Sequence, residues 1–196
     1  VLMERIFREY GIGVNAGKPQ VAYKETITIP VESEGKFIRQ SGGKGQYGHV
    51  WLRIEPGERG SGFEFRDQIR GGDVPKAFIP SVEAGAKSAL QSGGLAGYPV
   101  IDIKVTLYDG SFHEIDSSDV AFRMAAFLAM RDGIDKAKPI ILEPIMEVEI
   151  TTPNQFLGDI IGDLNSRRAH IEGIESHVES STIRCLGPLA ETFGFG

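Results

Sequence analysis

The sequence has little of several features that mark particular protein classes. It contains one cysteine, Cys185, so neither an intrachain disulfide nor a cysteine-based zinc site can form within it. Such scarcity is typical of a reducing compartment, and we expect a cytoplasmic protein. No apolar run approaches the length that crosses a bilayer, so we expect no membrane partner. The remaining composition, 41% hydrophobic and 24% charged, is that of an ordinary globular protein.

A basic excess is also missing. The net charge is −6, and Lys plus Arg minus Asp plus Glu gives +1 for residues 1–29, −1 for 30–138 and −6 for 139–196. General electrostatic attraction to nucleic acid is therefore not expected. A near-neutral middle segment can still contact RNA through a single loop.

Several catalytic patterns are absent from the sequence. There is no G-x-x-x-x-G-K-[ST] phosphate loop, no H-E-x-x-H pair and no G-x-S-x-G elbow. Residues 43–48 match G-x-G-x-x-G by letter, but a strand rather than a helix is predicted to follow them, which excludes dinucleotide binding. Cys185 lies in a predicted strand and is expected to be a core residue. We therefore predict no catalytic residue, no metal site and no enzyme activity in this chain.

Hydrophobic periodicity predicts two α+β units. The first has strands at 31–39, 47–54, 63–66 and 100–107 and helices within 75–92 and over 118–131. Residues 133–139, rich in Lys and Asp, are predicted to separate the units. The second has a strand at 142–151, a helix at 154–167 and strands at 169–178 and 181–187. This order is the beginning of a split βαβ unit of the ferredoxin-like kind.

The segment 109–119 connects a predicted strand to a predicted helix. Asp109-Gly110 has the composition of a turn, and Ser117 or Ser118 is a candidate helix start. The loop between them presents Ser111, Phe112 and His113. An aromatic and a histidine at a loop tip indicate a contact surface. In the alternative interpretation, Phe112 packs back onto the strand and His113 is a solvated turn residue.

A second loop, residues 40–46, joins the first two predicted strands and is rich in glycine. Its backbone can approach another backbone closely, with Lys44 available to a phosphate and Gln46 to a hydrogen bond. Recognition of RNA by shape, backbone contact and stacking has these requirements. The alternative interpretation is a flexible hairpin turn without a binding role.

Taken together, several blocks of the chain resemble the translation elongation factor G family. The blocks follow the order of the family and span essentially the whole chain; they are residues 21–27 (VAYKETI), 41–50 (SGGKGQYGHV), 95–100 (LAGYPV), 109–118 (DGSFHEIDSS), 142–146 (LEPIM) and 158–168 (GDIIGDLNSRR).

The resemblance implies a domain organisation. Residues 1–29 would end the third domain, 30–138 would be the fourth, and 139–196 would be most of a ferredoxin-like fifth domain that is truncated at its C-terminus. The fourth domain would resemble a ribosomal protein and contain a left-handed βαβ crossover. The chain is thus expected to be a fragment. It would bind no cofactor itself, while an upstream domain of the parent, a ribosome-stimulated GTPase, would bind GTP and Mg²⁺.

The resemblance also implies a site and its partners. The fourth domain would be an arm that enters the decoding region and contacts tRNA and mRNA, with His113 at its tip. The tip residues would be Gly42, Gly43, Lys44, Gly45, Gln46, Tyr47, Gly110, Ser111, Phe112, His113 and Glu114. Arg167 and Arg168, in the last turn of the predicted helix 154–167, are candidates for rRNA contact. Ribosome recycling factor is a further partner that the resemblance allows, and a monomer is expected.

Two of these residues depart from the pattern of close relatives. Phe112 and Lys44 stand where relatives often have Tyr and Arg. Phenylalanine retains the ability to stack, and lysine retains the charge but not the bidentate phosphate geometry of arginine.

Two other functions remain open at this point. One is a paralogue specialised for ribosome recycling or ribosome protection, although the SGGKGQYG loop favours the ordinary translocase. The other is a small-molecule kinase that shares the fold of the fourth domain. Such a kinase needs a Gly/Ser-rich phosphate loop that opens a helix, and the sequence contains none.

Overall fold

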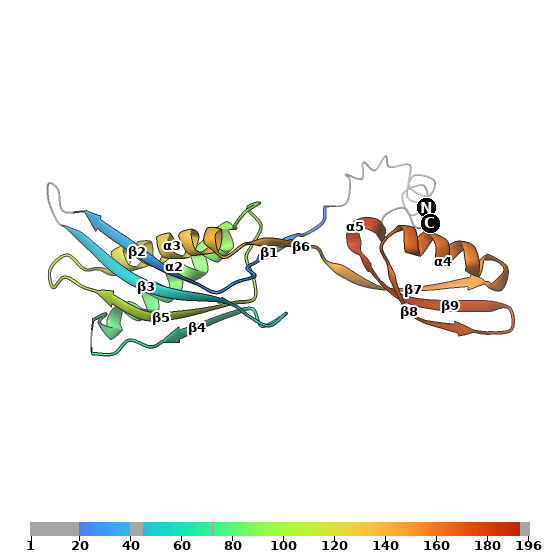
Figure 1. Cartoon of the computed structure of the whole chain (residues 1–196), viewed down its shortest axis with the longest axis horizontal. Helices are drawn as coiled ribbons and strands as arrows, with labels where there is room; N and C mark the ends of the chain where they lie inside the picture. The colour runs from blue at the N-terminus through green and yellow to red at the C-terminus, as the bar shows by residue number, and fades with distance from the viewer. Residues whose placement is uncertain (1–19, 40–44, 72, 193–196) are drawn as a thin grey trace, which may run out of the picture. The chain divides into compact units, whose positions relative to one another are not determined.

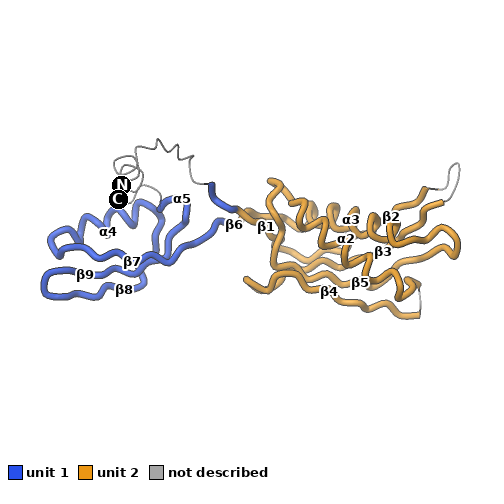
Figure 2. Tube along the Cα trace, turned by 180° about the vertical axis from the view of Figure 1, so that it is seen from behind, with its two compact units in different colours: residues 1–22, 143–196 blue, residues 23–142 orange. Residues whose placement is uncertain are grey.

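A computed structural model describes residues 20–39, 45–71 and 73–192 of the chain. The chain divides into two compact units, shown in two colours in Figure 2. The larger unit contains residues 23–142, and the smaller contains residues 20–22 and 143–192 of the described chain. Both combine sheets with few helices, so the predicted α+β class is confirmed. Within the described ranges, no helix has both the length and the apolar character needed to cross a membrane.

The larger unit is a four-stranded sheet with two helices on one face (Figure 1). The strand order is β2-β3-β5-β4, in which β2, β3 and β5 pair antiparallel and β4 and β5 pair parallel. A small ladder of β1 and β6 completes the unit. Its elements are β1 (Lys24–Thr26), β2 (Val31–Arg39), β3 (Gln46–Pro56), β4 (Phe63–Asp67), η1 (Lys76–Phe78), α2 (Ile79–Ser92), β5 (Ile103–Ser111), α3 (Asp119–Lys136) and β6 (Ile140–Leu142).

Strand periodicity and small helical residues together form the core of this unit. Val50, Leu52 and Ile54 alternate along β3 and are fully buried against the helices. The buried face of α3 is rich in alanine, which lets the helix approach the sheet closely. At Gly35 of β2, an added Cβ atom would collide with the carbonyl oxygen of Ala125 and lie 2.8 Å from the Cβ of Ala129. Only glycine fits this crossing.

A buried carboxylate joins two of the blocks on which the resemblance depends. Glu25 of β1 is fully buried, and its Oε1 atom accepts hydrogen bonds from the backbone N–H groups of Ala96 (2.8 Å) and Tyr98 (2.9 Å). The segment around 95–100 has no regular secondary structure of its own, so the carboxylate satisfies amides that no ladder pairs.

A β-bulge shifts the register between β3 and β5. Leu52 pairs with Leu107, whereas Trp51 pairs with Asp109, so Tyr108 is an extra residue on β5. Because side chains alternate along a strand, the extra residue changes which face the following side chains occupy. As a result, Ser111 lies opposite His49, on the face of the sheet that the helices do not cover.

The smaller unit has the strand order β7-β9-β8, with β9 antiparallel to both neighbours. β7 and β8 are therefore parallel and are joined through α4, which is the predicted split βαβ arrangement. Leu164 of α4 packs against Ile183 and Cys185 of β9. The elements are β7 (Ile145–Pro153), η2 (Asn154–Phe156), α4 (Leu157–Ser166), β8 (His170–Ser176), β9 (Ser180–Pro188) and α5 (Leu189–Thr192).

Several predicted boundaries were wrong. The strand predicted at 142–151 begins only at Ile145, after the separate short strand β6. Asp109-Gly110 is not a turn, because the bulge lets β5 continue to Ser111. β5 begins at Ile103 rather than at residue 100, because Asp102 has a left-handed φ of 59° that interrupts the extended chain. Residues 133–136 belong to α3, which ends where Lys138 (φ 50°) and Pro139 stop helix propagation. The two compact units divide between residues 142 and 143. The predicted domain boundary at 138/139 stays a prediction, as does the left-handed βαβ crossover.

Candidate functional site

The structure places most of the predicted tip residues at one end of the larger unit. Gly42, Gly43 and Lys44 lie outside the described residues. Gly45 immediately precedes β3, which begins with Gln46 and Tyr47. Gly110 and Ser111 end β5, and Phe112, His113 and Glu114 follow in the loop that leads to α3.

The two predicted loops meet through the start of β3. The backbone N–H of Tyr47 donates to the carbonyl oxygen of Asp116 at 2.8 Å, and a parallel bridge pairs Tyr47 with Ser117. Ser118 Oγ donates to Gln46 Oε1 at 3.1 Å. At Gly45, an added Cβ atom would meet the carboxylate of Asp116, which would have to move aside. Segments about 70 residues apart along the chain thus form one loop end, which we call the tip (residues 45–47 and 112–118).

The loop of residues 112–118 folds around the ring of His113. His113 Nδ1 accepts hydrogen bonds from the backbone N–H groups of Asp116 (3.1 Å) and Ile115 (3.3 Å). The backbone N–H of His113 donates to Ser117 Oγ at 2.8 Å, and that of Ser117 returns to the carbonyl oxygen of His113 at 3.0 Å. The loop therefore has a defined conformation and is more than a solvated turn.

These bonds assign the tautomer of His113. A nitrogen that accepts two N–H groups carries no proton, so the proton of the neutral ring is on Nε2. For the same reason, the Asp116 carboxylate 3.5 Å from Nδ1 is a neighbour of the ring and not its ion-pair partner. The His113 side chain is 45% exposed, so the tip offers one fixed N–H donor to an external acceptor.

The tip also carries exposed apolar side chains and a second ring beside His113. Phe112 is 42% exposed and Ile115 is 77% exposed. The ring of Tyr47 lies beside that of His113, with 6.1 Å between their centroids. The described tip thus combines a hydrogen-bond donor with exposed apolar surface of the kind that stacks on a base.

A second polar cluster, which the sequence did not reveal, lies directly beneath the tip. Ser111 Oγ is 2.7 Å from both the Tyr47 hydroxyl and His49 Nδ1, and His49 Nε2 is 2.9 Å from Glu34 Oε1. The Lys36 ammonium, 2.6 Å from the same oxygen, and the His49 imidazole hold the pKa of Glu34 below its ordinary value, outweighing desolvation. No sequence spacing relates these residues, because three strands and the bulge bring them together.

Ser118 caps the helix that follows the tip. It has an extended conformation, and its Oγ atom accepts a hydrogen bond from Ala121 N at 3.2 Å, as the sequence predicted for Ser117 or Ser118. We expect Ser118→Ala to lower the free energy of unfolding by about 1 kcal/mol, the usual value of such a cap. Urea unfolding followed by the fluorescence of Trp51 measures the change, with the exposed helical Ser88→Ala as control. An unchanged unfolding midpoint would contradict this role.

The two arginines predicted to contact rRNA lie at and beyond the end of α4. Arg167 is the C-cap, with Nε 3.0 Å from Asp163 Oδ2 and Nη1 donating to the Glu191 carbonyl oxygen. Arg168 follows with a left-handed φ of 60° and pairs with Glu143 (2.7 Å) and Glu191 (3.2 Å). These carboxylates, Glu143 first, raise the pKa of Arg168. Both guanidinium groups are thus engaged with acidic residues of the smaller unit.

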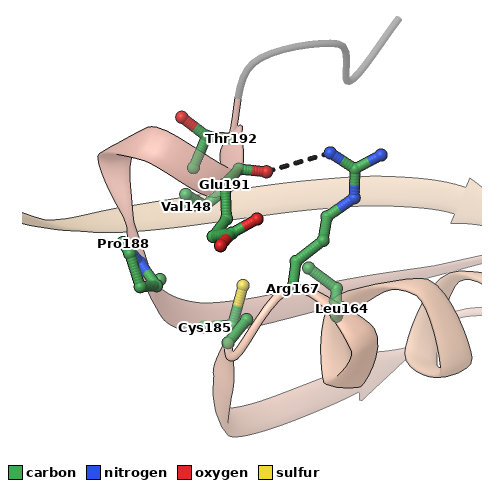
Figure 3. A pocket seen from close by; sticks show the side chains of 9 residues that line it. Val148, Leu164, Arg167, Cys185, Pro188, Glu191 and Thr192 are labelled. Atoms are coloured by element: carbon green, nitrogen blue, oxygen red, sulfur yellow. Dashed lines mark hydrogen bonds between the residues drawn. The ribbon is translucent and has the colours of Figure 1, made fainter. Parts of the chain in front are cut away.

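Arg167 also lines a small pocket in the smaller unit (Figure 3). The cavity is about 20 Å³, enough for about one water molecule, and its lining is mainly apolar. Cys185 lies on its wall and is fully buried, and burial raises the pKa of its thiol. Its burial in the core cluster of the smaller unit confirms the prediction of a core residue. Within the described ranges, no group of three or more His, Cys, Asp or Glu residues could hold a metal ion.

The fold consists of two α+β units that follow one another in the sequence, and the polar cluster of Glu34, His49, Ser111 and Tyr47 adjoins an exposed loop end of the larger one. The family model described as "Elongation factor G, domain IV" matches residues 19–138, and that described as "Elongation factor G C-terminus" matches residues 140–196. The chain therefore belongs to the elongation factor G family, a family of translation factors.

A solved structure supports the same assignment. The chain is similar to a protein of Thermus thermophilus known from a crystal structure, with 42% sequence identity and a TM-score of 0.83. The match covers 96% of this chain and 28% of that protein. The chain thus spans little more than a quarter of the length of this relative.

Proposed function

We propose that the chain is part of a GTP-dependent ribosomal translocase, in which its larger unit is the arm that enters the decoding region of the small subunit. The tip would contact tRNA and mRNA as they move. Another part of the full-length protein would bind GTP and Mg²⁺ and supply hydrolysis. The chain itself would act by steric and hydrogen-bonding contact, as a cytoplasmic monomer with rRNA, tRNA and mRNA as partners.

One observation carries this proposal. The tip joins the His113 loop and the start of β3 through hydrogen bonds, and the side chains of His113, Phe112 and Ile115 are exposed there. A neutral donor flanked by apolar surface suits phosphate oxygens, ribose hydroxyls and base edges in irregular RNA. The net charge does not supply affinity, which fits a segment that other parts of the protein deliver to its target.

The test is a single round of mRNA movement on pre-translocation ribosomes. The full-length protein would be compared with His113→Ala and with a variant that lacks residues 43–46. We expect both changes to slow mRNA movement about tenfold or more, while GTP hydrolysis stays near normal. For His113→Ala, this is the effect of losing one hydrogen bond to a charged acceptor. The control is His177→Ala, which changes an exposed loop histidine of the smaller unit.

Two outcomes would contradict the proposal. If both variants move mRNA at the parental rate, the tip does not make the contact. If the parent hydrolyses GTP on ribosomes but moves nothing, a paralogue specialised for recycling or ribosome protection takes its place, and ribosome splitting with recycling factor becomes the assay.

A further inference from the structure

The cluster beneath the tip forms an unbroken hydrogen-bonded relay (Glu34, His49, Ser111 and Tyr47). We propose that Ser111 and Tyr47 are positioning residues, through which the relay from Glu34 and His49 fixes the ring of His113. This inference rests on the proposed function, because it assigns the relay to the contact that His113 makes.

The proton positions along the relay follow from its ends. The carboxylate of Glu34 is ionised and can only accept, so His49 Nε2–H donates to it. In the tautomer with the proton on Nε2, His49 Nδ1 is then an acceptor for the hydroxyl of Ser111, 2.7 Å away. Ser111 Oγ in turn accepts from the Tyr47 hydroxyl, also at 2.7 Å. Each bond fixes the orientation of the next, which is the cooperative arrangement expected of a polar network.

Tyr47 connects the relay to the tip. Its hydroxyl ends the relay, its ring lies 6.1 Å from that of His113 between centroids, and its backbone N–H binds the carbonyl oxygen of Asp116 at 2.8 Å. Asp116 is one of the two residues whose N–H groups hold His113 Nδ1. The His113 ring is therefore held at Nδ1 by its own loop and lies beside the tilted ring of Tyr47. Releasing the Tyr47 hydroxyl would loosen the ring that lies beside His113.

The sequence of groups Ser–His–carboxylate also occurs in hydrolases, but the surroundings do not suit that chemistry. Ser111 is the last residue of β5 and is paired with His49, and the loop of residues 112–118 separates it from α3, so it does not lie on a sharp strand-to-helix turn. Its hydroxyl donates to His49 and already accepts from Tyr47. A positioning role uses all four residues, whereas hydrolysis would leave the Tyr47 bond unexplained.

The experiment uses three substitutions at two neighbouring positions of the relay. Ser111→Ala removes the central hydroxyl, Ser111→Thr keeps it on a residue that suits a strand, and Tyr47→Phe removes only the outer hydroxyl. The 196-residue chain, labelled with ¹⁵N-histidine, reports the ring nitrogens of His49 and His113 by NMR. The full-length protein reports single-round mRNA movement, and Ser88→Ala on the exposed surface of α2 is the control.

We expect Ser111→Ala and Tyr47→Phe to shift the His113 ring resonances, although Ser111 reaches that ring only through Tyr47, and to slow mRNA movement about three- to tenfold. Ser111→Thr should keep the parental His113 resonances and the parental rate of mRNA movement. A variant that combines Ser111→Ala with Tyr47→Phe should move mRNA no more slowly than Ser111→Ala alone. Unchanged His113 resonances in Ser111→Ala and Tyr47→Phe would overturn the proposal. So would parental mRNA movement in both variants while His113→Ala slows it.

Failure of the proposed function gives a different result. In that case His113→Ala itself leaves mRNA movement unchanged, and the NMR arm alone decides whether the relay positions the ring. Because Tyr47→Phe deletes a single oxygen atom and keeps the ring, it should fold even if Ser111→Ala does not.

Discussion

Replacing His113 by Asn is expected to keep the tip folded and yet slow mRNA movement about tenfold or more, the effect of losing one charged-acceptor hydrogen bond. The side-chain oxygen of Asn occupies the place of Nδ1 and can accept the N–H groups of Ile115 and Asp116, as Asn commonly does in turns. It has no donor at the place of Nε2. His113→Gln is the converse: its amide reaches the Nε2 position but leaves those backbone N–H groups without their acceptor.

The two substitutions separate the folding of the loop from its contact with RNA. Hydrogen exchange of the Ile115 and Asp116 amides measures the first, and single-round mRNA movement measures the second. We expect slow amide exchange with slow movement for Asn, and fast amide exchange with partly retained movement for Gln. His177→Asn is the matched control. If the His113→Asn variant moves mRNA as fast as the parent, the Nε2–H group makes no contact that affects the rate of movement.

Gly35→Ala is expected to have the largest effect on stability, a loss on the order of 3 kcal/mol in the free energy of unfolding. The added methyl group would meet the carbonyl oxygen of Ala125 and the Cβ of Ala129, both of which belong to α3. A side chain can rotate away from such a clash, but backbone cannot. The helix must therefore move away from the sheet or the strand must bend.

Urea unfolding of the whole chain measures this loss. Trp51 is the only tryptophan and lies in β3 of the larger unit, so its emission reports the unfolding of that unit. The control is Lys36→Ala, the next residue of β2, whose side chain is exposed and pairs with Glu34 at the surface. It should change stability by about 1 kcal/mol or less. If the urea unfolding midpoint of Gly35→Ala equals that of the control, α3 can move away from the sheet without loss of stability.

Local patterns predicted much of the fold. The alternation along β3, the cap at Ser118 and the strand–helix–strand–strand order of the smaller unit are all properties of short segments, and the structure has each of them. The loop that carries Phe112 and His113 between a strand and a helix was also predicted from the local sequence, and the structure has it.

What the sequence could not predict depends on tertiary context. Asp109-Gly110 has the composition of a turn, and only pairing with β3 makes it strand. The end of α3 was placed too early because Gly133 suggests a break, whereas burial against Ile54 favours helix there. The relay was missed because Glu34, His49 and Ser111 belong to three strands, and their meeting depends on register. No spacing rule contains that information.

The bulge at Tyr108 has a practical consequence for anyone who aligns or exchanges these loops. A relative whose β5 lacks the bulge would be one residue shorter between Leu107 and Ser111, and its pairing with β3 would be the same on both sides of that point. The gap in such an alignment therefore belongs at Tyr108. If the gap were placed in the loop after Ser111, this serine would be matched to a residue on the opposite face of the sheet. A loop graft is safest when it begins at Asp109, so that each recipient keeps its own bulge.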